Sequence, residues 1–402
     1  MSDNIYLFPE LEKELRELRS TGVLPSQKIQ EFIQNGRIRA TLGEVDVKIW
    51  DQQIQPASLD LRLGSEAHRV RASFLPGKSS TVAEKIRQLE MTCVNLDRPD
   101  GAIFEKGCTY IVPLMEELSL PDDISGKSNP KSTTGRLDIF TRLITDYGTE
   151  FERVAPGYRG KLYLEVVPRT FSIKVQTNTR LTQLRLVRGG PLPLREDASL
   201  GKIHERDPLA YTHDDIPANS EFDRGRLISL DLTRGGDSEV VGYKAKRYAP
   251  LVDLKQVDYY DPEEFWEPIR SRRSLILNPG DFYILVSKEK VSIPPYLAGV
   301  MTAYDPSLGE FRIHYAGFFD PGFGYGLEQG KGTHAVLEVR SHEVPFVIED
   351  GQVVGRLIYE RLMELPDKIY GPRIGSSYQS QGLSLSKQFK RPQVASEAAT
   401  AI

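Results

Sequence analysis

The stretch V-A-P-G-Y-R-G-K-L-Y-L-E-V-V-P, residues 154–168, has a near-copy further along the chain. The second version reads F-D-P-G-F-G-Y-G at residues 319–326 and continues as H-A-V-L-E-V at residues 334–339. Each version contains Pro-Gly followed by an aromatic residue, and each ends on Leu-Glu-Val inside an apolar run typical of a strand. A carboxylate in such a run needs a physical reason, and it occurs twice, at Glu165 and Glu338.

Other sequence markers repeat at nearly the same interval. Ser58-Leu-Asp-Leu61 recurs 171 positions later as Ser229-Leu-Asp-Leu232. Markers in one order at one offset predict two β-domains of common ancestry, and the alternative is two sandwiches that share only turn chemistry. The remaining pairs, at offsets of 171 or 173, are Gly107 and Gly280, Gly126 and Gly299, Glu165 and Glu338, and Arg185 and Arg356.

Short β-branched runs separated by Gly and Pro predict a mainly β protein after a short helical N-terminus. We expect helices at residues 9–20 and 27–35, the second capped by Ser26, and a helix or ordered loop at residues 261–273. The expected divisions are an N-terminal helical segment (1–50), a first domain (51–190), a linker (191–222), a second domain (223–365) and a C-terminal tail (366–402).

The composition limits the classes of function. The net charge of −4 argues against a partner that is a nucleic-acid polymer or a membrane surface, although it permits a small anionic ligand. Cys93 and Cys108 are too few for a disulfide framework and lack metal-ligand spacing. The charged N-terminus is not of the signal-peptide type, so we expect a cytoplasmic protein.

Five motifs are distinctive, namely Q-P-A-S-L-D-L-R-L-G (55–64), S-G-K-S-N-P-K-S-T-T-G-R-L (125–137), A-P-G-Y-R-G-K-L-Y-L-E (155–165), Y-A-G-F-F-D-P-G-F (315–323) and R-I-G-S-S-Y-Q-S-Q-G (373–382). These motifs resemble those of the dCTP deaminase and dUTPase superfamily. The resemblance implies two tandem dUTPase-like domains, each a β-clip or distorted jelly-roll barrel.

The chain lacks the His-x-Glu and Cys-x-x-Cys signatures of zinc-dependent nucleobase deaminases. The resemblance implies a zinc-free route, in which a partly buried glutamate moves protons between water, the cytosine ring and the departing ammonia. Glu165 is the candidate, because the first copy retains the basic residues of the phosphate-binding motif. The alternative is a solvated or salt-bridged strand glutamate.

The resemblance implies roles for further residues of the first copy and of the tail. Ser128 and Arg153 are expected to act in catalysis beside Glu165, and Tyr163 is expected to line the base pocket from the same strand face. The alternatives without a binding role are a solvated turn for the phosphate motif and disorder for the tail. The other expected substrate-binding residues are Lys127, Lys131, Arg136, Tyr378, Gln379 and Gln381, with Ser376 and Ser377 beside them in the tail.

The second copy shows the reverse pattern. It retains Asp320-Pro-Gly, where the first copy has Ala155, but reads A-Y-D-P-S-L-G at residues 303–309 in place of the phosphate motif. An aspartate there would repel a triphosphate. Sites of this superfamily lie between neighbouring subunits, so a fused pair is able to build one site from both copies. The second-copy candidates are Glu338, Asp320 and Ala316.

The sequence therefore predicts a zinc-independent hydrolase that converts dCTP to dUTP and ammonia. Mg²⁺ is expected to accompany the triphosphate, bound through phosphate oxygens and water. The resemblance also suggests a homo-oligomer, with a trimer as the expected form. Two alternatives stay open, namely an enzyme that also cleaves dUTP to dUMP and pyrophosphate, and a non-catalytic nucleotide sensor on the same fold.

Overall fold

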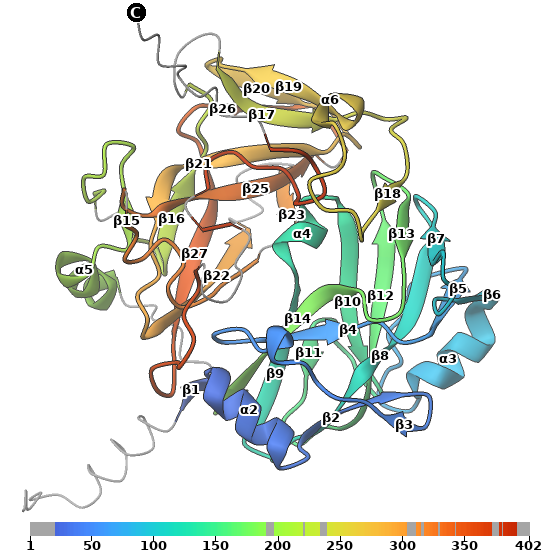
Figure 1. Ribbon diagram of the computed structural model, residues 1–402. Coiled ribbons are helices and arrows are strands. Elements are labelled where there is room, and N and C mark those ends of the chain that lie inside the picture. The colour runs from blue at the N-terminus through green and yellow to red at the C-terminus, as the bar shows by residue number, and fades with distance from the viewer. Residues whose placement is uncertain are drawn as a thin grey trace, which may run out of the picture.

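The computed structural model describes residues 21–189, 197–219, 222–233, 239–303, 311–314, 317–328, 330–341, 343–371, 378–379 and 381–391. Two β-domains lie side by side, the first in blue to light green and the second mainly in yellow-green to red (Figure 1). One cluster of buried hydrophobic side chains fills the first domain and continues into the second through Trp266 and Phe282, and another lies within the second domain. The helix expected at residues 9–20 lies outside the described residues.

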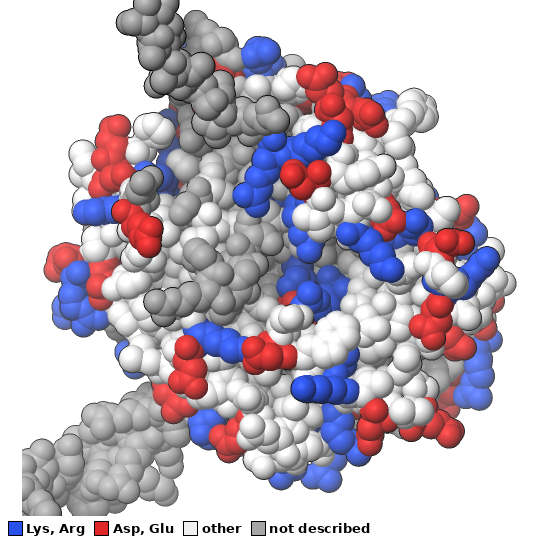
Figure 2. Space-filling view, viewed as in Figure 1, with Lys and Arg blue, Asp and Glu red and all other residues white. Residues whose placement is uncertain are grey.

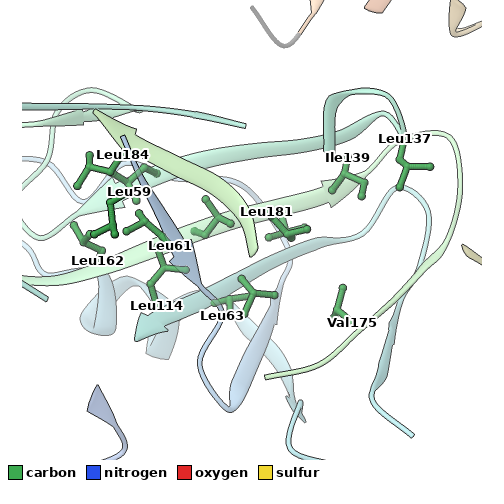
Figure 3. Close-up of a cluster of buried hydrophobic side chains, with 14 of the residues drawn as sticks. Leu59, Leu61, Leu63, Leu114, Leu137, Ile139, Leu162, Val175, Leu181 and Leu184 are labelled. Carbon is green, nitrogen blue, oxygen red and sulfur yellow. The ribbon is translucent and has the colours of Figure 1, made fainter. Parts of the chain in front are cut away.

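The first domain packs two sheets face to face. Figure 3 shows leucines of both sheets meeting in its core, such as Leu59 and Leu184 from one sheet and Leu114 and Leu162 from the other. One sheet contains β10 (Ile139–Thr145), β12 (Arg159–Pro168), β8 (Thr109–Ser119), β2 (Ile38–Leu42) and β3 (Val45–Asp46), with β5 (Glu66–Val70) and β6 (Glu90–Asn95) at its side. The other contains β1 (Gly22–Val23), β14 (Arg180–Arg188), β9 (Ile124–Pro130), β11 (Arg153–Val154) and β4 (Leu59–Arg62).

The second domain repeats this arrangement. One sheet runs β19 (Trp266–Arg270), β17 (Val240–Ala245), β21 (Tyr283–Val291), β25 (Thr333–Ser341) and β23 (Phe311–His314), with β15 (Ala210–Tyr211) on β21. The other runs β16 (Arg226–Ser229), β27 (Val353–Arg361), β22 (Leu297–Ala303) and β24 (Phe318–Phe319). Smaller sheets contain β18 (Val252–Asp253), β13 (Ile173–Val175) and β7 (Ala102–Phe104), and β20 (Ser274–Leu277) with β26 (Phe346–Glu349).

The predicted mainly β fold with two related domains is confirmed. The strand order β10-β12-β8 of the first domain corresponds to β23-β25-β21 of the second. Glu165 lies on β12 and Glu338 on β25, the middle strand of each triplet. Gly107 and Gly280 both adopt positive φ angles, 80° and 75°, which explains why the repeat has glycine at these turns.

The helices are short and lie between strands. α2 begins at Ser26 with Pro25 at its N-cap, so the prediction that Ser26 caps this helix is wrong: its hydroxyl donates to the side chain of Gln27 instead. No helix among the described residues is long and apolar enough to span a membrane. The helices are α2 (Ser26–Gln34), η1 (Asp51–Gln53), α3 (Val82–Leu89), α4 (Ser132–Gly135), α5 (Asp197–Arg206) and α6 (Pro262–Phe265).

Three stretches differ in detail from the expectation. Residues 38–46, expected within the helical N-terminal segment, form β2 and β3. β2 pairs with β8 of the first domain. The stretch expected as a linker contains α5 and also β15, which pairs with β21 of the second domain. Residues 261–273 hold only one turn of helix, α6, because the apolar side chains that follow it join β19.

Candidate active site

The side chain of Glu338 is buried at the centre of β25. It is 6% exposed, and its carboxylate forms no ion pair with any described residue. Burial raises the pKa of Glu338 to about 8, while the nearby Arg136 guanidinium opposes the rise and Asp138 adds to it. A carboxyl group with this pKa exchanges its proton near neutral pH, which is the property that a general acid and base needs.

Arg136 comes from the first domain, directly after α4, which lies where the two domains meet (Figure 1). Its guanidinium donates one hydrogen bond to Gln381 Oε1 at 2.8 Å and one to the carbonyl oxygen of Ser384 at 3.0 Å. Its Cζ atom also lies 3.8 Å from the ring centroid of Tyr378. One buried arginine thus joins the first domain to the C-terminal tail beside Glu338.

A small cavity of about 60 Å³ lies in front of Glu338. It is lined by Ser132 and Arg136 of the first domain, by Glu338 and Asp320 of the second, and by the tail. Its other walls are aromatic and aliphatic, a surface on which a flat nucleobase packs well. The aromatic lining residues are Phe318, Phe319, Phe323, Tyr370 and Tyr378.

Asp320 lies in the same cavity and is 7% exposed. Burial raises its pKa to about 6, and the charges of Arg185 and Lys131 oppose this rise. Asp320 and Glu338 are therefore two buried carboxyl groups with different pKa values in one cavity. Such a difference lets one group hold a proton while the other is ionised.

Glu165, the equivalent of Glu338, has a different environment. Its carboxylate oxygen Oε1 accepts hydrogen bonds from Arg142 Nη2 at 2.6 Å and Nε at 2.9 Å. Arg142 Cζ in turn lies 3.6 Å from the ring centroid of Phe151, so the guanidinium is held in place. Glu165 does not line the Glu338 cavity. The geometry is that of an ion pair between β10 and β12, in which the Glu165 carboxylate is buried and Arg142 is partly exposed.

The other catalytic candidates of the first copy also lie away from Glu338. Ser128 is 1% exposed and shares a hydrogen bond of 2.8 Å with the hydroxyl of Thr182. Lys127 and Arg153 face a separate cleft of about 1010 Å³, where Arg153 forms a surface ion pair with Glu150. Tyr163 packs in a small hydrophobic cluster next to Glu165. The structure does not bring these residues to the Glu338 cavity.

A basic cavity of about 310 Å³ lies next to the segment 131–136, which also contributes Ser132 and Arg136 to the Glu338 cavity. Lys131 and Arg180 line it and share Asp60 as an ion-pair partner, with Lys131 Nζ 2.5 Å from Asp60 Oδ1. Lys255 and Lys387 of the second domain and tail complete it. Figure 2 shows Lys and Arg atoms in a hollow near the middle of this face. Ser132 lines the Glu338 cavity and its neighbour Lys131 lines the basic cavity, so both cavities border the same short segment of the first domain.

The described part of the tail closes over the Glu338 cavity. Tyr378 and Gln381 line it. The side-chain amide of Gln379 donates to the carbonyl oxygen of Gly322 at 3.1 Å and accepts from the backbone N–H of Gly324 at 3.2 Å. These contacts are partly buried. The candidates Ala316, Ser376 and Ser377 lie outside the described residues.

Several residues that line the cavity were not predicted as site residues, among them Ser132, Tyr370 and the apolar Met301, Phe318, Phe319, Phe323, Val336 and Leu337. Ser132 stands four positions before Arg136 inside the phosphate-like motif, so the motif's own spacing was a usable signal. Tyr370 precedes the tail motif and carries no signal in the sequence pattern.

One group of side chains among the described residues is close enough to hold a metal ion. It consists of Glu66, His68 and Cys93, on the paired strands β5 and β6. Glu66 and Cys93 are exposed, and none of the three lines the Glu338 cavity.

Comparison with known proteins identifies the class. Residues 20–190 match the 2'-deoxycytidine 5'-triphosphate deaminase (DCD) N-terminal domain, and residues 196–389 match the C-terminal domain of the same family. The chain belongs to the dCTP deaminase family.

Individual relatives agree with this assignment. The crystal structure of 2'-deoxycytidine 5'-triphosphate deaminase from Agrobacterium tumefaciens matches with a TM-score of 0.78 and 46% identity, covering 87% of this chain and 100% of that chain. The chain is also 28% identical over 170 residues to a "dCTP deaminase, dUMP-forming" from Streptomyces coelicolor, covering 41% of this chain and 80% of that protein. A dCTP deaminase from Natronomonas pharaonis is 30% identical over 130 residues, which is 32% of this chain and 61% of that protein.

Proposed function

We propose that the chain hydrolyses dCTP to dUTP and ammonia, with Glu338 rather than Glu165 as the group that moves protons. The observation that carries the proposal is the environment of Glu338. Its carboxylate is buried and without an ion-pair partner among the described residues, and it shares a cavity with Arg136 of the first domain and with the tail. Glu165 has its carboxylate held by Arg142.

The chemistry follows from the raised pKa of Glu338. The ionised carboxylate takes a proton from water, and the resulting hydroxide attacks C4 of cytosine. The carboxyl group returns this proton to N3, then takes the proton of the new C4 hydroxyl and passes it to the amine. The C4–N bond breaks as C4=O forms, so that water and dCTP give dUTP and ammonia. Acid–base catalysis of this kind contributes roughly 10²- to 10⁴-fold to a rate. The Arg136 guanidinium adds positive charge beside the cavity, which favours the ionised form of Glu338.

We assign the triphosphate to the basic cavity beside the segment 131–136. Lys131, Arg180 and Lys387 give it positive charge, which Asp60 partly neutralises in the free protein. A triphosphate would compete with Asp60 for Lys131, because ammonium groups bind phosphate oxygens well. Mg²⁺ would accompany the nucleotide, held mainly by phosphate oxygens and water.

The size of the Glu338 cavity bears on how the nucleotide binds. About 60 Å³ is far below the roughly 300 Å³ or more of usual ligand pockets. The tail contacts of Tyr378 and Gln381 close this cavity. We therefore assign the tail a gating role: it moves away when dCTP binds and closes again during the reaction.

Product analysis tests the activity. The purified protein is incubated with dCTP and, separately, with dUTP, and ammonia, dUTP, dUMP and pyrophosphate are measured. The proposal predicts ammonia and dUTP from dCTP and no pyrophosphate from dUTP. Pyrophosphate from dUTP would support the dUMP-forming alternative, the activity for which the Streptomyces relative is named. Absence of ammonia release would support the nucleotide sensor.

Two further parts of the proposal have separate checks. Ammonia release should survive zinc chelators, because the proposed mechanism has no zinc step, and loss of activity on chelation in excess Mg²⁺ would contradict it. The expected homo-oligomer of three chains rests on the superfamily resemblance, and analytical ultracentrifugation measures it directly.

A further inference from the structure

Arg185 belongs to the first domain but places its charged group against the second. It lies on β14 and is 1% exposed. Its Nη1 atom donates hydrogen bonds to the carbonyl oxygen of Gly299 at 3.1 Å and to Glu360 Oε2 at 3.0 Å. Both acceptors belong to adjacent strands, β22 and β27, of the second domain. Glu360 and Gly299 therefore hold the guanidinium from one side.

The other side of the same guanidinium contacts the wall of the Glu338 cavity. Its Cζ atom lies 4.0 Å from the ring centroid of Phe318, and Nη2 donates to the carbonyl oxygen of Phe319 at 3.4 Å. Nη2 is also 3.7 Å from Asp320 Oδ1, within ion-pair distance. Three consecutive residues that line the cavity are thus held by one side chain of the other domain.

We propose that Arg185 is a positioning residue for the deamination, through which the first domain fixes the Phe318–Asp320 wall of the Glu338 cavity. The inference rests on the proposed function. It explains why the site needs both domains in one arrangement. The first domain supplies Arg136 to the cavity, and through Arg185 it also sets the geometry of β24 and Asp320 in the second domain.

The chemistry of arginine suits this task. A planar guanidinium can stack on Phe318 while it donates in its own plane to Phe319, Gly299 and Glu360, which a lysine ammonium cannot do. Arg356, the equivalent arginine of the second copy, provides the matched control. It pairs with Asp223 and does not line the Glu338 cavity.

The charge effect has a defined sign. Arg185 lowers the pKa of Asp320, so removing its charge raises that pKa and leaves less ionised Asp320 at a given pH. The acid limb of kcat/KM reports two ionisations of the free enzyme, that of Glu338 with a pKa of about 8 and that of Asp320 with a pKa of about 6. Loss of the Arg185 charge should move the Asp320 part of this limb to higher pH. The ionisable groups that interact with Asp320 are Arg185, Lys131, Asp60 and Tyr370, and Arg136, Glu338 and Tyr378 line the same cavity.

The experiment compares R185K, R185Q and R356K with the wild type, using kcat, KM and pH profiles of ammonia release from dCTP. We expect R185K to lower kcat at least about ten-fold, since a small misplacement of a site wall costs up to about 10²-fold. R185Q should also move the acid limb to higher pH, and R356K should stay within about two-fold of the wild type. Folded R185K and R185Q with unchanged kcat and unchanged acid limb would overturn the inference.

Two further measurements test the inference if the arginine variants do not fold or if the wild type is inactive. E360Q removes the charge that anchors Arg185 from a position outside the cavity, and it should lower kcat in the same direction. If the arginine variants do not fold, unchanged kcat in E360Q would overturn the inference. If the wild type releases no ammonia, the proposed function fails. The role of Arg185 in positioning the site is then tested by calorimetric measurement of dCTP affinity. R185K is expected to bind dCTP at least about three-fold more weakly than the wild type, and R356K is expected to bind it as tightly as the wild type.

Discussion

The Arg136 guanidinium of the first domain stacks on the Tyr378 ring of the tail, with Cζ 3.8 Å from the ring centroid. This contact closes a cavity whose buried carboxyl group, Glu338, belongs to the second domain. The site is therefore a product of three distant parts of the chain. Neither copy of the repeat contains it alone.

The tail contact predicts a loss of substrate affinity when it is removed. Y378A and Q381A should each raise KM for dCTP about ten-fold, because a cation–π contact or a hydrogen bond to a charged group is worth about 1–2 kcal/mol. Michaelis–Menten kinetics measure the effect. Y248A is the control, since Tyr248 is 99% exposed and does not line the cavity. Equal KM values in all three variants would speak against tail closure.

The raised pKa of Glu338 predicts a pH-dependent stability. Between the ordinary value of 4.5 and the folded value of about 8, the unfolded chain releases a proton that the folded protein keeps. Stability therefore falls as the pH rises through this window, by up to about 1.4 kcal/mol per pH unit. E338Q cannot ionise, so it should have a higher Tm than the wild type at pH 8 and nearly the same Tm at pH 5.

Thermal unfolding at both pH values checks this prediction. The control is E44Q, because Glu44 is exposed and should give the same Tm as the wild type at either pH. A Tm difference between E338Q and the wild type that does not change with pH would contradict the account.

Arg142 should matter for stability rather than for chemistry. R142M leaves the carboxylate of Glu165 buried without its ion-pair partner, which costs roughly 3–5 kcal/mol. The double variant R142M/E165M should recover much of this loss, since an apolar pair of similar volume replaces the ion pair. Urea unfolding gives the free energies. The ammonia release per folded molecule should stay near that of the wild type in both variants.

The sequence was sufficient for the fold and for part of the candidate site. Repeated markers such as Gly107 and Gly280 reveal the two domains, because a positive-φ turn keeps its glycine. Arg136, Tyr378 and Gln381 were expected near a substrate, and the structure brings all three to one cavity.

The choice between the two glutamates depended on tertiary structure. The basic motif and Glu165 lie in one copy of the repeat, so the sequence favours pairing them within that copy. In the folded chain the loop of the first domain faces the β25 strand of the second, and Arg136 meets Glu338. The Arg142–Glu165 ion pair was likewise not predictable from the sequence, because it depends on the register of β10 and β12, which places Arg142 opposite Glu165. Local motifs carry no information on either contact.

Ammonia release from dCTP by E338Q and E165Q tests the central claim most directly. Each glutamine keeps the size of its glutamate and removes the ability to exchange a proton. The account predicts that E338Q loses at least about 10²-fold in kcat, while folded E165Q stays within a few-fold of the wild type. Full activity in E338Q together with loss of activity in folded E165Q would contradict it and would place the chemistry on β12.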